Sequence, residues 1–274
     1  MVFGNKADYE LCFLDENWCK IVDIQENSQL FANQLYEMRK AKGLTQIQAT
    51  ELVKQPIYYA MMLLKNNMAD GVVAGASYTT ADVLRPAFQI IKTKPNKSLV
   101  TGSMIMLKEG KQPMLFGDIS LINKPNSEQL KEIALSNAEF MKNMLKIEPK
   151  VAMLSYSTHG SAKSDEISIV QNAMELLKDA EYLIDGEMQA DTALDQATAI
   201  KKGITSKVGG NANVLIFPNL DAGNIAYKLV QILGGYETIG PFMINLNKPV
   251  NDLSRGCNCE TIINTVCLTK LQME

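Results

Sequence analysis

The sequence predicts an α/β fold in which helices connect parallel strands. After residue 150, short apolar runs alternate with longer amphipathic stretches, which is the pattern of βαβ units. A similar succession of strand, loop and helix surrounds residues 71–91. The 274 residues, 46% of them apolar, can fill the core of one large α/β unit or of two smaller domains.

The first part of the chain is predicted to be mainly helical. A β-branched run at residues 20–24 precedes apolar residues at helical spacing from Leu30 to Lys42, and Gly43 ends that helix. A second helical pattern runs from Thr45 to Asn66, and Pro56 should bend or divide it.

A short buried strand at Gly71–Gly75 leads through a polar loop into a helix that contains Leu84 and Ile91. Arg85 lies in the first turns of that helix, where the helix dipole disfavours a positive charge. We therefore expect that anion binding accounts for this arginine.

An antiparallel hairpin is predicted next. The runs Leu99–Leu107 and Pro113–Gly117 flank a charged turn that contains one glycine. We expect this hairpin to lie at a sheet edge. Asn126 or Ser127 then caps a helix, and Pro149 closes the first half.

The second half is predicted to contain strands at 151–154, 182–184, 214–217 and 239–244 and helices at 164–180 and 192–201. The apolar stretch at 261–271 could form either a helix or a strand. Ligands of parallel sheets bind beyond the carboxyl ends of the strands. The loops 155–161 and 218–223 leave two of these strands. The first is rich in hydroxyl groups and could hold a phosphate with its N–H groups, although an ordinary capping loop has the same composition.

Composition argues against several classes of function. With 27 basic and 30 acidic residues, the net charge of −3 gives no field that would recruit nucleic acid or an anionic membrane. No apolar run is long enough to span a membrane, so we expect a soluble, cytoplasmic protein. Five cysteines form an odd set, which argues against a disulfide framework, and a single histidine, His159, argues against a four-ligand zinc site.

Residues 248–260, KPVNDLSRGCNCE, place a hydroxyl, a guanidinium and a glycine between two apolar runs. Ser254, Arg255 and Gly256 are therefore predicted to lie in a turn or at the start of a helix, where free N–H groups attract anions. The planar fork of arginine also suits phosphate. The alternative is that Ser254 is only a helix cap beside a surface charge.

The run 249–257, PVNDLSRGC, closely resembles the C-terminal signature of the phosphate acetyltransferases, also called phosphotransacetylases. Four other segments resemble that family in its order: LRPAFQIIKT at 84–93, LSYSTHGSA at 154–162, LIDGEMQ at 183–189 and VLIFPNLDAGN at 214–224. Members usually begin with a strand and a helix ahead of the part that resembles Met1–Gly4. We therefore expect a truncated sequence or an internal start.

The resemblance implies two α/β domains with a cleft between them, similar to the isocitrate and isopropylmalate dehydrogenases. We expect a first domain at residues 1–148, a second at 149–251, and a C-terminal segment, 252–274, that returns to the first. That return would place Ser254 and Arg255 where the domains meet.

The resemblance also implies reversible transfer of an acetyl group between CoA and inorganic phosphate, by direct thiolate attack in a ternary complex. CoA is then a substrate, no cofactor is needed, and the partners are acetyl-CoA, phosphate and acetyl phosphate, with a homodimer as the expected assembly. The expected catalytic residues are Ser254, Arg255 and Glu260, and the expected substrate-binding residues are Arg39, Arg85, Ser155, Ser157, Thr158, Gly160, Ser161, Asn219 and Asn251.

A general base must take the proton of the CoA thiol, because a thiol with a pKa near ~8.5 is mostly protonated at neutral pH. Relatives usually carry an aspartate where this chain has Thr261. Glu260 is the nearest substitute, although neighbouring helix positions point about 100° apart. Asp252 is the other carboxylate close to the motif.

Two other functions stay open at this point. Similar domains fused to malic enzymes sense acetyl-CoA without turning it over, and Thr261 and the missing front segment favour such a binding module. Phosphate butyryltransferase is a third candidate, although residues 251–256, NDLSRG, are closer to the acetyl enzymes. The presence of Ser254 and Arg255 favours the enzyme.

Overall fold

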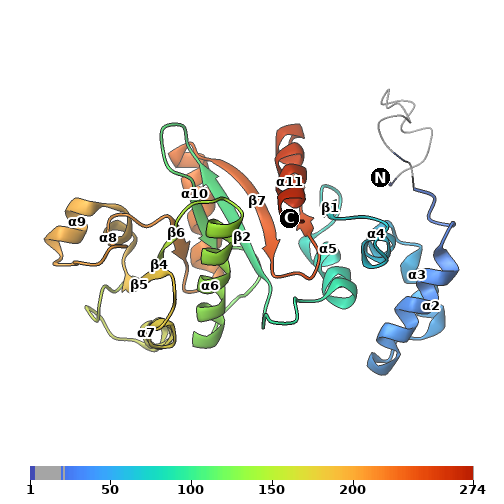
Figure 1. Ribbon diagram of the computed structural model, residues 1–274, viewed down its shortest axis with the longest axis horizontal. Coiled ribbons are helices and arrows are strands. Elements are labelled where there is room, and N and C mark those ends of the chain that lie inside the picture. The colour runs from blue at the N-terminus through green and yellow to red at the C-terminus, as the bar shows by residue number, and fades with distance from the viewer. Residues whose placement is uncertain (4–19, 21, 274) are drawn as a thin grey trace.

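The computed structural model describes residues 1–3, 20 and 22–273, and its strands form one eight-stranded mixed sheet (Figure 1). The strands are β1 (Val72–Ala74), β2 (Thr101–Leu107), β3 (Met114–Gly117), β4 (Lys150–Leu154), β5 (Leu183–Met188), β6 (Val214–Ile216), β7 (Glu237–Ile244) and β8 (Val250–Asp252). Their order across the sheet is β1-β8-β7-β2-β3-β6-β4-β5. The predicted α/β class is confirmed, and the likeness to isocitrate dehydrogenase stays a prediction.

Helices pack on the sheet and extend beyond both of its ends. They are α2 (Ser28–Arg39), η1 (Lys40–Lys42), α3 (Gln46–Val53), α4 (Pro56–Lys65), α5 (Thr80–Pro86), η2 (Ala87–Ile91), α6 (Ser127–Asn143), α7 (Asp165–Leu177), α8 (Ala190–Leu194), α9 (Gln196–Lys201), α10 (Leu220–Gly234) and α11 (Cys259–Leu271). In Figure 1, α2 and α3 lie at one end of the molecule, and α8 and α9 lie at the other.

The helix boundaries follow local sequence signals. Thr45 and Asn126 each form a capping box with the glutamine three residues later, at the start of α3 and α6. Pro56 is the first residue of α4, where its missing N–H costs nothing, so it divides the long helical pattern as predicted.

The hairpin of β2 and β3 lies in the middle of the sheet, so the prediction of an edge position is wrong. β2 pairs with β7 on its other side, and β3 pairs with β6. The turn signal fixes how the two strands pair with each other. It carries no information about strands, more than 90 residues away, that cover the outer edges.

Packing joins residues 101–148 to the strands that follow them. Helix α6 contacts α7 and strands β4 and β6, and its apolar face shares a core cluster with Val151, Val214 and Phe242. A separate cluster joins α2, α3, α4 and α5. The division into domains stays a prediction.

The C-terminal segment lies against the first part of the chain. Strand β8 pairs in parallel with β1, and α11 contacts β1, β7 and β8. The sequence prediction did not include β8, because its three residues fall inside the motif around Ser254. It also treated residues 218–223 as a loop, whereas α10 begins at Leu220.

The turn after β3 is organised by a buried carboxylate, that of Asp118. Its two oxygens accept hydrogen bonds from the N–H groups of Gly102, Ser120, Leu121 and Ile122, at 2.9–3.1 Å. Burial raises the pKa of Asp118, although these four donors oppose the rise.

Replacing Asp118 with alanine should lower the free energy of unfolding by about 3–5 kcal/mol, because it leaves four N–H groups without their acceptor. Asp118→Asn, which retains one carbonyl oxygen, should lose about half as much. Urea unfolding followed by circular dichroism measures both. A loss below about 1 kcal/mol for the alanine variant would show that the turn does not depend on this carboxylate.

Candidate active site

Three adjoining pockets, which share lining residues, together form one cleft. The Arg39 pocket, of about 490 Å³, is lined by residues of α2, α3 and α4 and by Gln89. The Arg85 pocket, of about 720 Å³, shares Arg39 and Gln89 with it. The Ser254 pocket, of about 660 Å³, shares Thr80, Ala81 and Ser120 with the Arg85 pocket and also contains Asp252, Ser254 and Arg255.

The chain has only three arginines, and all three line this cleft. Arg39 ends α2, Arg85 lies in α5, and Arg255 lies in the turn between β8 and α11. Among the described residues, none of them forms a salt bridge with a carboxylate. Three guanidinium groups without a partner carboxylate in one cleft suit a ligand with several anionic groups.

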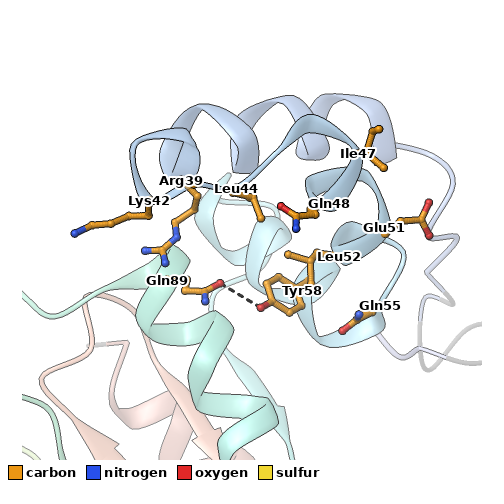
Figure 2. Close-up of a pocket in the computed structure, with 11 residues that line it drawn as sticks. Arg39, Lys42, Leu44, Ile47, Gln48, Glu51, Leu52, Gln55, Tyr58 and Gln89 are labelled. Carbon is orange, nitrogen blue, oxygen red and sulfur yellow. Dashed lines mark hydrogen bonds between the residues drawn. The ribbon is translucent and has the colours of Figure 1, made fainter.

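The Arg39 pocket combines a cationic rim with an apolar wall. Figure 2 shows Arg39 extending toward the helix that carries Gln89, with the ring of Tyr58 between Leu52 and Gln89. The Tyr58 hydroxyl donates a hydrogen bond to Gln89 Oε1 at 3.2 Å. Burial raises the pKa of Tyr58, and the charges of Arg85 and Arg39 oppose this rise. Arg39 and Arg85 also line one pocket together, the Arg85 pocket.

Ser254 and Arg255 are exposed in a tight turn. The N–H of Gly256 donates to Ser254 Oγ at 3.2 Å, and the N–H of Cys257 donates to the Ser254 carbonyl at 3.0 Å. The opposite wall of the Ser254 pocket comes from α10, with Asp221, Asn224 and Tyr227. The pocket therefore lies between the C-terminal turn and a helix from the middle of the chain.

The loop Ser155–Ser161 does not line any of these three pockets. Ser157 Oγ and the N–H of Gly160 both donate to Glu187 Oε1, at 2.8 and 2.7 Å. The N–H of Thr158 donates to Ser161 Oγ at 2.9 Å, and the N–H of Ser157 donates to Ser155 Oγ at 3.2 Å. Burial opposes ionisation of Glu187, but its hydrogen bonds, including those from Ser157 and Gly160, hold its pKa below the usual value. The Ser157 hydroxyl and the Gly160 N–H are therefore used within the protein, and phosphate binding by this loop stays a prediction.

Three other predicted residues also have structural positions. Asn219 is the N-cap of α10 and accepts from the N–H of Ala222. Asn251 is fully buried, accepts from the N–H of Met243 and donates to Thr269 and Gln272, so no polar group is left for substrate. Glu260 is exposed in the first turn of α11, outside the Ser254 pocket. A part for these three residues in the site stays a prediction.

The structure adds residues that the sequence prediction left out. Thr80 and Ser120 lie where the Arg85 and Ser254 pockets meet, and Tyr58 lies in the wall of the Arg39 pocket. The polar run after β1 was a signal for Thr80. No local signal marked Ser120, because the Asp118 turn brings it to the cleft. In the described part of the chain, no group of three potential metal ligands occurs, and no helix is long and apolar enough to cross a membrane.

Comparison with known proteins identifies the family. A family model described as "Phosphate acetyl/butaryl transferase" matches residues 3–270. A curated phosphate acetyltransferase from Clostridium acetobutylicum is 43% identical over 272 residues, covering 95% of this chain and 81% of the relative. Another, from Bacillus subtilis, is 46% identical over 238 residues, covering 86% of this chain and 73% of the relative.

A solved structure gives the same result. A phosphotransacetylase from Staphylococcus aureus superposes with a TM-score of 0.88 at 40% identity, covering 100% of this chain and 86% of that one. The sequence, the fold and the arginine-lined cleft therefore agree, and this chain belongs to the phosphate acetyl/butyryl transferase family.

Proposed function

We propose that this chain is a phosphate acetyltransferase that converts acetyl-CoA and phosphate reversibly into CoA and acetyl phosphate. The observation that carries the proposal is the cleft in which all three arginines of the chain line pockets adjoining Ser254. Acetyl-CoA carries phosphate groups, and the second substrate is phosphate itself. The guanidinium groups along the cleft can therefore bind the phosphate oxygens of both substrates. The relatives named above support the same activity.

The Arg39 pocket suits the nucleotide end of CoA. Leu44, Leu52 and Tyr58 offer an apolar wall, while Arg39 and Lys42 supply positive charge. The thiol end would then extend through the Arg85 pocket toward Ser254, because the pockets share lining residues. Acetyl phosphate would occupy the Ser254 pocket beside Arg255.

The chemistry assigned to the Ser254 pocket is a direct acetyl transfer. The thiolate attacks the carbonyl carbon of acetyl phosphate, a tetrahedral oxyanion forms, and phosphate leaves. Ser254 donates a hydrogen bond to the oxyanion, and Arg255 stabilises the charge on the phosphoryl oxygens. Among the residues that the structure describes, no lysine or histidine lines this pocket to activate Ser254 as a nucleophile.

The direct test is CoA-dependent formation of acetyl-CoA from acetyl phosphate, with butyryl phosphate measured in parallel. We expect turnover with acetyl phosphate at a higher kcat/KM than with butyryl phosphate. Preference for butyryl phosphate would make the chain a phosphate butyryltransferase. Calorimetric binding of acetyl-CoA without turnover in either direction would establish the binding module instead.

Helix α10 supports the proposal of a homodimer. Ile225, Leu229, Ile232 and Leu233 form one stripe at helical spacing, and all four side chains are more than half exposed. A continuous apolar stripe on a helix surface marks an interaction site. Ile225 also lines the Ser254 pocket, so the interface would border the cleft.

Replacing Leu229 and Leu233 together with glutamate should raise the dissociation constant of the dimer at least about 100-fold, because both charges would be buried without a partner. Sedimentation velocity over a concentration series measures it. The exposed charge reversal Lys178→Glu, which follows α7, is the matched control and should leave the dimer intact. A wild-type chain that stays monomeric would refute the proposal.

We also propose a cytoplasmic location. Cys257, Cys259 and Cys267 are free thiols in the structure. Free thiols are typical of proteins from reducing compartments.

A further inference from the structure

A buried carboxylate lies at the end of β8, two residues before Ser254. Asp252 is 2% exposed, yet it lines the Ser254 pocket. β8 runs parallel to β1, so Asp252 lies at the carboxyl ends of these two strands, which is where ligands of α/β sheets bind. Its Oδ1 atom has no hydrogen-bond partner among the described residues. A buried carboxylate oxygen without a partner is costly and calls for an explanation.

The surrounding backbone is shaped to admit this carboxylate. Gly75, at the end of β1, has a φ of +125°, and a methyl group there would lie 2.2 Å from Asp252 Oδ1. Burial raises the pKa of Asp252, and the Thr80 hydroxyl and the backbone of Leu253 oppose the rise. A carboxylate with a raised pKa is a stronger base than an exposed one.

The other carboxylates near the motif are less suitable. Asp221 lines the same pocket but is exposed, and Glu260 lies outside it. The titratable or charged side chains that share the pocket with Asp252 are Tyr78, Asp221, Tyr227 and Arg255. β1 carries no such group, and Asp82 and Arg85 of α5, Glu237 of β7, and Glu260 and Lys270 of α11 do not line the pocket.

We propose that Asp252 is the general base that takes the proton of the CoA thiol, an inference that rests on the acetyltransferase function proposed above. The S–H proton moves to a carboxylate oxygen, and the thiolate forms the new bond to the acetyl carbon. The bond from that carbon to the phosphate oxygen then breaks, and phosphate leaves with the electron pair. In the reverse direction the protonated Asp252 returns the proton to the departing thiolate. This role accounts for a buried carboxylate beside the reacting atoms.

The test is the pH dependence of acetyl-CoA formation in the wild type, Asp252→Asn and Asp221→Asn. In the wild type, activity should fall as the pH drops through the pKa of Asp252, which lies above that of an ordinary carboxyl group. Asp252→Asn should lose roughly 10²- to 10⁴-fold in kcat and lack this acid limb, its residual rate rising with the thiolate fraction up to about pH 8.5. Asp221→Asn should keep the limb. An Asp252→Asn variant with the wild-type pH profile overturns the inference.

A second variant decides the case if Asp252→Asn does not fold by circular dichroism. Thr80→Val removes a donor that lowers the pKa of Asp252, so the acid limb should move to higher pH. A limb at its wild-type position would overturn the inference. Absence of turnover in the wild type is a different result, because it rejects the acetyltransferase function and with it any general base.

Discussion

Replacing Arg255 with alanine is expected to lower kcat/KM for acetyl phosphate by roughly 10³-fold, through loss of a charged group that stabilises phosphoryl oxygens in the transition state. Arg255 lines the Ser254 pocket and has no salt-bridge partner among the described residues, so its charge is available to substrate. Steady-state kinetics with acetyl phosphate varied at saturating CoA measures the effect.

The lysine variant shows how much of this loss belongs to the shape of the group. Arg255→Lys retains the charge but lacks the planar fork, so we expect it to recover only part of the activity. Lys270→Ala removes an exposed charge from α11 and serves as the control for a general change of surface charge. Wild-type kinetics in Arg255→Ala would remove this residue from the site.

The sequence predicted most elements because each has a local cause. Capping boxes at Thr45 and Asn126 and the proline at the start of α4 act within one turn of chain. The position of the hairpin could not be predicted in this way. Its outer edges pair with β6 and β7, and nothing inside residues 99–117 specifies those partners.

The same distinction applies to the site. Arg39, Arg85 and Arg255 could be selected from residue type and resemblance, and the structure places all three on adjoining pockets. The hydroxyl-rich loop looked equally suitable, but the Ser157 hydroxyl and the Gly160 N–H donate to Glu187, a residue 26 positions beyond Ser161. Composition shows which groups a segment contains, and only the fold shows which of them remain free to bind a ligand.

Asp252 is the opposite case, because the fold, and not its position in the sequence, makes it the candidate base. In the sequence it is one of two carboxylates near the motif, the other being Glu260. Its burial results from Gly75, which approaches the carboxylate closely, and from the pairing of β1 with β8. A base can therefore be proposed from the structure although the sequence offered Glu260 first.

Replacing Ser254 with alanine should lower kcat by roughly 10²-fold and change KM little, because one oxyanion donor is lost in the transition state alone. Ser254 is exposed in its turn and lines the pocket with Arg255, so its hydroxyl can reach substrate without movement of the core. A change in KM alone would make Ser254 a group that binds substrate equally in the ground state and the transition state.

Mass spectrometry separates this role from covalent catalysis. Incubation with acetyl phosphate in the absence of CoA should leave Ser254 unmodified, since no lysine or histidine of the described part of the chain lines the pocket to remove its proton. Asp252 is a carboxylate that could serve instead, so Asp252→Asn is the matched sample. An acetyl group on Ser254 in the wild type but not in Asp252→Asn would mean that Asp252 activates the serine. The thiol would then attack an acyl-enzyme, and the ternary-complex mechanism would be wrong.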